Sequence, residues 1–523
     1  MLSEKNRLIA VLSIFFLISV TGSIIQAKYT YDPFHWGLVS QSALDLLDNK
    51  IPYKDIFIHY GFFSTLTHSI ILLIFEKNII YLLYFSAIFY SLANFILCLV
   101  AYKFLNFKSV LLITTIIFLV HPFANHPWYN YQFYLLIVLS LYFITLENNL
   151  SFFLSGIFIS LSTLVYENFL YLSLLIVMLF VIINYQNKKK LFHLVVGYFI
   201  PIALFNLFLL YFGLHQYWIK TFTLNSAFLE IYNLSIIELF YSYLKVILSK
   251  NIFSESYFYI YFVIFFSNIY LIFKFLLKLI NKKKLDYDSQ FFLYCAVISQ
   301  LLFLSTLHNP TIFRFSTGPI IGMISLLYIY ENFKYKFKYL ITIFVLLILF
   351  SSSALPIKGQ NNKFFPLFSE IEENVKNKKL LFFKSQLWNQ KNWTQLNMID
   401  KTAKTVSNKC NSIFKFMNLT DDAFFYMIAN QYLKSEQYIY WYKNERYYDV
   451  LFAHYEKNLN NQLNEALKKR DTIIFFNIRN KPFINKKFKL QNYTIIETPY
   501  SYQQKRNAIL IPRECYLKVE KFL

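Results

Sequence analysis

The first apolar segment of the chain leads directly into Tyr31-Asp32-Pro33-Phe34-His35-Trp36-Gly37. Two more polar stretches follow soon after, Ile51-Pro52-Tyr53-Lys54-Asp55-Ile56 and Tyr60-Gly61. A loop that only joins two membrane helices has no need of carboxylates, imidazoles, a proline and a glycine together. The concentration of these side chains therefore predicts a chemical site beside the first apolar segment.

The composition places most of the chain in a lipid bilayer. Of its 523 residues, 57% are hydrophobic and only 15% are charged, whereas charged residues make up about 25% of an ordinary soluble domain. The net charge of +22 comes largely from lysines clustered between apolar segments, a pattern that indicates membrane topology. No nucleic-acid-binding motif accompanies the charge, so we expect no nucleic-acid partner.

About 20 apolar residues are needed to cross the hydrocarbon core of a membrane. Eleven segments are predicted to do so: 8–26, 80–102, 109–123, 130–146, 150–165, 169–185, 191–212, 256–279, 289–307, 311–330 and 339–355. The hairpins 109–146 and 150–185 contain short members and are alternatively tilted or re-entrant. Segments 61–77 and 236–250 are expected to lie along the outer membrane surface, the alternative being that either one is a true span.

The lysines predict the orientation of the chain in the membrane. Connections on one side carry Lys5, Arg7, Lys103, Lys108, Lys188–Lys190, Lys282–Lys284, Lys334, Lys336 and Lys338. The opposite connections 124–129, 166–168 and 308–310 contain no lysine or arginine. We therefore expect a multi-pass protein of the cytoplasmic (inner) membrane whose N-terminus is cytoplasmic, with residues 8–26 retained as a helix instead of being cleaved as a signal peptide.

Residues 356–523 are expected to form a separate extracytoplasmic α/β domain, because the long apolar runs stop there. Periodic runs predict helices at 420–433 and 447–469. The predicted strands are 411–417, 436–441, 472–476, 493–497 and 507–511. The domain has no glycine-rich phosphate loop, so we expect it to recognise the acceptor or to cover the membrane site. Cys410 and Cys515 both fall in it, and whether they pair in an oxidising compartment stays open.

The polar stretches quoted above resemble the first extracytoplasmic loop of the GT-C superfamily, polytopic glycosyltransferases that use polyprenyl-phosphate-linked sugars. In that family an acidic residue just after the first membrane helix acts on the acceptor, and Asp32 occupies the matching position. The resemblance implies an α-helical polytopic membrane protein of GT-C type, for which the apolar segments predict about eleven membrane helices. Residues 1–355 would form its catalytic domain, with a first outer loop at 27–79, and residues 356–523 the α/β domain.

The resemblance also implies an activity. It points to transfer of a hexose or pentose, with inversion, from a polyprenyl-phosphate donor to an extracytoplasmic glycan, lipid or protein. The related enzymes are of the dolichyl-phosphate-mannose protein mannosyltransferase and aminoarabinose transferase type. The alternative is a polytopic transporter or a flippase of lipid-linked glycans. That class would place polar residues deep within the spans and show repeat symmetry, whereas here the polar residues crowd one face.

Asp32 is the candidate catalytic residue. Its carboxylate can take the proton from an acceptor hydroxyl as that hydroxyl attacks the anomeric carbon. The structural alternative is a helix cap, because Asp32 followed by Pro33 is also typical of the N-cap and first position of a helix over residues 33–48.

Seven further side chains are candidates for binding the substrates: His35, Asp55, His59, Tyr60, Glu167, His308 and Arg314. All histidines except His193 lie on or near the predicted outer face, which indicates a polar site there; the alternative is chance. Asp55 occupies the second acidic position of the family's loop and would orient a sugar or stabilise a turn.

Glu167 is the only charged residue between Glu147 and Lys188. Such an isolated carboxylate is a functional candidate, or it marks the outer turn of a hairpin. Arg314 would clamp the donor phosphate, or its side chain extends to the lipid headgroups.

His121 and His126 flank Pro122-Phe123-Ala124-Asn125 in the second outer connection and are weak candidates for ligands of a divalent metal ion, the only cofactor considered. Contacts with sugar or phosphate are favoured over metal binding at these histidines, because no carboxylate lies nearby in the sequence.

Overall fold

The computed structural model describes most of the chain. The described residues are 3–120, 123–124, 126–183, 187–223, 235, 237–238, 241, 245, 257–281, 285–306, 312–332, 342, 374–376, 380–410, 414–435, 437, 439–440, 464–466, 468–478, 492–498 and 506–522.

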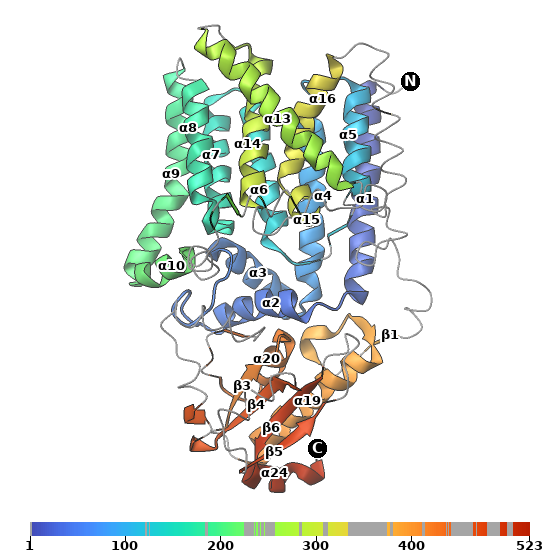
Figure 1. Cartoon of the computed structure of the whole chain (residues 1–523), viewed down its shortest axis with the longest axis vertical. Helices are drawn as coiled ribbons and strands as arrows, with labels where there is room; N and C mark the ends of the chain where they lie inside the picture. Colours follow the sequence, from blue (N-terminus) through green and yellow to red (C-terminus); the bar gives the residue numbers. More distant parts are fainter. Residues whose placement is uncertain are drawn as a thin grey trace.

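A bundle of apolar helices forms the larger part of the molecule (Figure 1). Its members are α1 (Glu4–Tyr29), α4 (Ile80–Tyr102), α5 (Phe107–Val120), α6 (Tyr129–Ile144), α7 (Asn149–Val165), α8 (Leu170–Ile183), α9 (Lys188–Tyr211), α13 (Tyr257–Ile280), α14 (Tyr287–Ser305) and α16 (Met323–Glu331). Large apolar side chains face outward, with Leu17 61%, Leu204 62% and Phe273 63% exposed. Apolar area of this kind requires a lipid environment.

Five of the described helices, α1, α4, α9, α13 and α14, are long and apolar enough to cross a membrane. The number eleven stays a prediction, because residues 339–355 lie outside the described part except for Thr342, and most of 236–250 lies outside it as well. The predicted span 311–330 is wrong as a single helix. Gly318 and Pro319 divide it into α15 (Ile312–Ser316), the 3-10 turn η2 (Pro319–Gly322) and α16, because proline cannot continue a helical hydrogen-bond ladder.

Two helices, α2 (Pro33–Leu47) and α3 (Phe62–Ile74), lie across the end of the bundle where α1 ends and α4 begins, called the α2 end below (Figure 1). The start of α2 is as predicted. Asp32 is its N-cap, with Oδ1 accepting a hydrogen bond from the His35 amide at 3.2 Å, and Pro33 occupies the first turn. The α2 end therefore carries the polar stretches that opened the sequence analysis.

A C-terminal α/β domain lies beyond α2 and α3 (Figure 1). Its main sheet has the order β3-β4-β6-β5, with β3 parallel to β4 and the other neighbours antiparallel. The elements of the domain are β1 (Asn374–Lys376), β2 (Leu387–Asn389), α19 (Gln390–Lys409), β3 (Lys415–Leu419), α20 (Ala423–Ala429), β4 (Thr472–Asn477), β5 (Tyr493–Glu497), β6 (Asn507–Pro512) and α24 (Arg513–Val519). Its described part also contains two short 3-10 turns, η3 (Leu381–Phe383) and η6 (Glu520–Phe522).

Four of the five predicted strands correspond to β3, β4, β5 and β6. The described residues of 436–441 form no strand. Instead, the side chain of Gln437 bonds to the edge of β3: its Oε1 accepts from the Asn418 amide, and its Nε2 donates to the Asn418 carbonyl, both at 2.8 Å. Helix α19 was not predicted. Most of the predicted helix 447–469 lies outside the described residues.

A disulfide joins Cys410, which follows α19, to Cys515 in α24, with the Cα atoms 5.4 Å apart. The pairing left open by the sequence is therefore present. It ties the last helix of the domain to the helix that precedes its main sheet.

The α/β domain shares a core with α2. Trp36 and Leu44 of α2 belong to the same buried cluster as Trp388 and Phe424 of the domain. Helix α20 packs directly on α2. The closest approach is at Gly37, where a Cβ atom would lie only 2.6 Å from the Cβ of Ala423. Any side chain at position 37 would force the two helices apart.

We therefore expect Gly37→Ala to weaken the attachment of the α/β domain. Overpacking of this kind typically costs about 1–3 kcal/mol, so the melting temperature should fall and protease should cut between bundle and domain sooner. Ala423→Gly in the same protein should restore part of the loss, because it removes the nearest atom. A Gly37→Ala protein that melts like the wild type would show that the helix contact is not tight.

Candidate active site

Asp32 and two histidines form the centre of the site. Asp32 Oδ2 lies 2.6 Å from His35 Nδ1, one turn along α2, and 3.1 Å from His126 Nδ1 in the connection between α5 and α6. That connection is held against α1, because the Ala124 amide donates to Ser23 Oγ at 2.9 Å. The side chains of Asp32, His35 and His126 are 18–31% exposed. The carboxylate is thus both a helix cap and part of a polar cluster that solvent can reach.

The two imidazoles set the charge state of Asp32. Burial alone would raise the pKa of its carboxyl group, but hydrogen bonds and charge interactions with His126 and His35 outweigh burial and hold the pKa well below its usual range. Asp32 therefore remains an anion at every physiological pH.

Trp128 connects this cluster to Arg314. The Trp128 ring lies 4.6 Å from the ring of His35, and the Arg314 guanidinium carbon lies 5.6 Å from the Trp128 ring centre. Phe313, next to Arg314 in α15, packs edge-on against the same ring at 4.5 Å. The Trp128 ring thus lies between the buried Arg314 guanidinium and His35, the imidazole that bonds to Asp32.

Arg314 lines a small pocket between α6, α14 and α15. Most of its lining residues carry polar groups, and those beside Arg314 are Tyr129, Asn130, Tyr166, Ser305, Thr306 and Thr317. Among the described residues, Trp128 Nε1 and Asn130 Oδ1 are buried polar atoms with no hydrogen-bond partner. Buried polar atoms are costly to leave unpaired, so these two atoms are suited to a bound molecule.

His59 and Tyr60 lie beside the cluster. Tyr60 packs on Tyr129 at 4.2 Å and on Trp128 at 5.9 Å, and the His59 ring lies 4.4 Å from that of Tyr60. Burial, together with the charges of His35 and Arg314, lowers the pKa of His59 to about 4. His59 is therefore neutral at pH 7 and presents an uncharged imidazole.

Glu167 is not part of the Asp32 cluster in this structure. Its carboxylate accepts hydrogen bonds from the Tyr53 hydroxyl, from the Phe62 amide at 3.0 Å and from Trp218 Nε1 at 2.9 Å. These three donors come from the first outer loop, from α3 and from α10 (His215–Phe222). The carboxylate therefore fastens three segments together at the α2 end.

Asp55 is exposed and closes its own turn, because its Oδ2 accepts from the Ile51 amide at 3.0 Å. His308 and His121 lie outside the described residues. Of the predicted site residues, the structure brings together Asp32, His35, His59, Tyr60, His126 and Arg314.

Sequence reasoning missed Trp128, Tyr129 and Asn130. Tyrosine and phenylalanine are so abundant here, 43 and 60 residues, that aromatic residues carry little information. Tryptophan occurs only six times. Trp128 follows His126 and Pro127 in a short connection that lacks lysine and arginine. A rare tryptophan at this position could have indicated a site residue.

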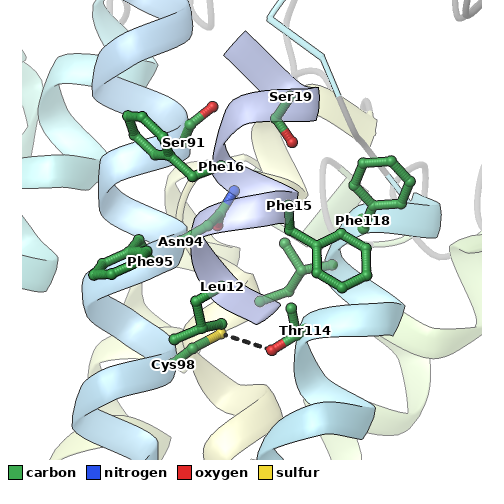
Figure 2. A pocket seen from close by; sticks show the side chains of 11 residues that line it. Leu12, Phe15, Phe16, Ser19, Ser91, Asn94, Phe95, Cys98, Thr114 and Phe118 are labelled. Atoms are coloured by element: carbon green, nitrogen blue, oxygen red, sulfur yellow. Dashed lines mark hydrogen bonds between the residues drawn. The ribbon is translucent and has the colours of Figure 1, made fainter. Parts of the chain in front are cut away.

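A separate cleft lies within the bundle between α1, α4 and α5 (Figure 2). Phenylalanine rings line it together with Ser91, Asn94 and Thr114, and the Thr114 hydroxyl donates to Cys98 Sγ at 3.4 Å. The nearest lining residue on α1, Ser19, is about 15 Å along the helix from Tyr29. The cleft is therefore distinct from the Asp32 cluster.

The bundle, the crossing helices at its α2 end and the small C-terminal sheet form a mostly helical fold that is consistent with the fold the resemblance implied. The structure is similar over 97% of the chain to ArnT from Cupriavidus metallidurans bound to undecaprenyl phosphate, with a TM-score of 0.52, 9% identity and 97% of that chain covered.

Similarity also extends over 97% of the chain to the Archaeoglobus fulgidus oligosaccharyltransferase in complex with Zn and sulfate, with a TM-score of 0.50, 12% identity and 76% of that chain covered. The same enzyme tethered to an acceptor peptide containing the NVT sequon matches over 98% of the chain, with a TM-score of 0.50, 13% identity and 77% coverage.

Neither a protein-family model nor a curated protein matches the sequence itself. The apolar helices and these similarities together identify an integral membrane protein. The transporter alternative finds no support in them.

The burial of Glu167 predicts that the stability of the protein depends on pH. Burial raises the pKa of its carboxyl group from 4.5 to about 7, although the bonds from Tyr53, Phe62 and Trp218 act in the opposite direction. Between these two values the folded protein binds a proton more readily than the unfolded chain. The free energy of unfolding should therefore fall as the pH rises from about 4.5 to 7, by roughly 3 kcal/mol for this group.

Glu167→Gln should abolish this slope, because an amide does not titrate. Thermal unfolding in detergent between pH 4.5 and 8 measures it. Glu147→Gln is the matched control, since it removes an exposed carboxylate and should leave the slope unchanged. If the Glu167→Gln protein keeps the wild-type slope, other groups cause it.

Proposed function

We propose that the protein is a membrane glycosyltransferase that transfers one hexose or pentose from a polyprenyl-phosphate donor to an extracytoplasmic glycan, lipid or protein. One observation carries the proposal: His35, which is paired with Asp32, and the Arg314 guanidinium pack against the same side chain, Trp128. Transfer from a lipid phosphate needs a site for the acceptor hydroxyl beside a site for the phosphate, and these groups are suited to those two tasks.

We further propose that the α2 end faces away from the cytoplasm of a cell whose inner membrane holds the bundle. Lys5, Lys103 and Lys188 lie at the start of α1, the end of α4 and the start of α9, which are the helix ends away from α2. Lysine marks the cytoplasmic side. The Cys410–Cys515 disulfide supports the same orientation, because disulfides persist in oxidising compartments.

In the proposed reaction the acceptor oxygen forms a bond to the anomeric carbon while the bond from that carbon to the phosphate oxygen breaks. The lipid phosphate leaves with the electron pair, and the acceptor proton passes to the carboxylate of Asp32. Attack from the side opposite the phosphate inverts the anomeric carbon. His35 and His126 keep Asp32 ionised, which it must be in order to accept a proton.

Arg314 is proposed to bind the phosphate of the donor. A guanidinium can donate two parallel hydrogen bonds to phosphate oxygens and stabilise the charge that develops on the leaving group. Arg314 is only 8% exposed, which strengthens such an interaction because water is excluded. Trp128 Nε1 and Asn130 Oδ1 lie beside it and are proposed to contact the sugar.

The Asp32 cluster also fits a divalent metal ion. Ligand atoms of Asp32, His35 and His126 lie within 4.8 Å of one another, and two imidazole nitrogens with one carboxylate oxygen suit zinc, iron or manganese. When bound, such an ion would lower the pKa of an acceptor hydroxyl.

The proposed function is tested by mass spectrometry of the lipid that co-purifies with the protein. A polyprenyl-phosphate sugar is the expected result, and it would then serve as donor in transfer assays with native membranes as the source of acceptor. Recovery of ordinary phospholipids alone, with no transfer from any polyprenyl-phosphate sugar, would contradict the proposal.

Asp32→Asn should reduce transfer by at least about 100-fold, the lower range of general-base contributions. The melting temperature should change little, because asparagine also caps helices and a lost cap costs only about 1 kcal/mol. Asp48→Asn, at the exposed far end of α2, is the control and should transfer like the wild type.

The metal content of the purified protein separates the two roles of Asp32. Loss of a stoichiometric metal ion from both Asp32→Asn and His126→Ala would assign Asp32 to metal binding. A well-folded Asp32→Asn protein with wild-type transfer would remove Asp32 from either role.

Arg314→Lys should lower transfer by roughly 10- to 100-fold, because lysine keeps the charge but loses the paired hydrogen bonds, worth about 1.5–3 kcal/mol. Arg7→Lys, at the opposite end of the bundle, serves as the control. Equal donor affinity and turnover in Arg314→Lys and wild type would mean that the guanidinium does not bind the phosphate.

A further inference from the structure

The α/β domain holds the two residues that precede Asp32. Trp388 Nε1 donates a hydrogen bond to the Thr30 carbonyl at 2.8 Å, and the Tyr31 hydroxyl donates to Asp422 Oδ2 at 3.1 Å. Trp388 and Asp422 are separated from these partners by more than 350 positions in the chain. A part of the protein with no candidate catalytic group is thus bonded to the residues next to Asp32.

Aromatic packing reinforces these bonds. The Tyr31 ring meets Trp388 edge-on at 4.9 Å and Phe424 at 5.8 Å. Trp388 is 1% exposed and stacks in turn on Trp393 at 4.8 Å. Tyr31 therefore packs against a buried cluster of aromatic side chains of the domain.

Asp422 is itself fixed in place. Its other oxygen, Oδ1, accepts from the Phe424 amide at 3.0 Å and caps α20. Since α20 packs on α2 at Gly37, the hydroxyl of Tyr31 is bonded to a helix that is already docked. If the carboxylate of Asp422 moved with Tyr31, it would break its hydrogen bond with the Phe424 amide, which caps α20.

The other end of α2 is attached to the same domain. Asp45, fully buried, accepts from the Tyr440 hydroxyl at 2.7 Å, from Gln41 Nε2 at 2.7 Å and from Lys50 Nζ at 2.8 Å. The α/β domain is therefore bonded to the two residues that precede Asp32, the N-cap of α2, and to Asp45 near the last turn of the same helix.

We propose that the α/β domain positions Asp32 for the reaction, with Asp422 and Trp388 as positioning residues acting through Tyr31 and Thr30. This inference rests on the proposed function, because that function defines the reaction for which Asp32 is positioned. A misplacement of a reacting group by about 1 Å can cost about 100-fold in rate, so bonds at the adjacent residue affect turnover without touching substrate. The domain thus contributes to chemistry and not only to acceptor recognition or covering the site.

The test uses full-length protein in lipid nanodiscs and the variant Tyr31→Phe, which removes the hydroxyl and keeps the ring. Tyr432→Phe is the matched control. The Tyr432 hydroxyl donates to Asp400 Oδ1 at 2.8 Å, so the control removes the same kind of bond within the domain, away from Asp32. Hydrogen exchange of peptides covering residues 30–37 and the kcat and KM for the co-purified donor are measured for both.

For Tyr31→Phe we expect exchange about tenfold faster in residues 30–37 and kcat about tenfold lower, with KM for the donor and the melting temperature unchanged. Tyr432→Phe should change none of these quantities. Asp422→Asn should keep near-normal kcat, because its Oδ1 can still accept from the Phe424 amide while its Nδ2 donates to the Tyr31 hydroxyl oxygen. Asp422→Ala should lose both bonds and turnover.

Faster exchange with unchanged kcat in Tyr31→Phe would overturn the positioning role. Identical exchange in Tyr31→Phe and Tyr432→Phe would overturn the anchoring of Asp32 altogether. If the wild type transferred no sugar from any polyprenyl phosphate, the proposed function would fall, while the exchange comparison would still decide whether the domain holds the Asp32 segment.

Discussion

The hydrogen bond from the His35 amide to Asp32 Oδ1 starts α2, and the rest of the α2 end depends on where that helix begins. A start at this residue leaves Oδ2 free to face two imidazoles. It also places Gly37 against Ala423, so that the α/β domain can dock. One capping interaction therefore links local helix formation to the polar cluster and to the assembly of the two parts of the chain.

The carboxylates of Asp32 and Glu167 lie at the same end of the bundle, but their surroundings favour different charge states and therefore different roles. Asp32 is surrounded by imidazoles and is stabilised as an anion. Glu167 receives only neutral donors, and burial raises its pKa. A buried carboxylate without a cation is favoured as the neutral acid. The first group is therefore suited to reaction chemistry, and the second to holding the outer loop, α3 and α10 in place.

Local features of this fold were predictable from sequence because neighbouring residues determine them. The Asp32 cap, the α2 helix and four strands belong to this class. The Trp128 contacts and the Asp45–Tyr440 bond could not be predicted, since they join residues that meet only when the bundle and the domain pack. Helix α19 was missed although its apolar residues, among them Trp393, Leu396 and Ile399, recur with a helical spacing. Its many polar residues masked that pattern.

The side chain of Gln437 has a consequence for the protein beyond its own fold. Its amide bonds to both backbone groups of Asn418, where a neighbouring strand would otherwise pair. Unpaired strand edges recruit strands from other molecules. Many copies of a membrane protein share one crowded surface, with their domains side by side. At Asn418 the glutamine satisfies both backbone groups, so this position of β3 has no unpaired backbone group to offer to a strand of another molecule.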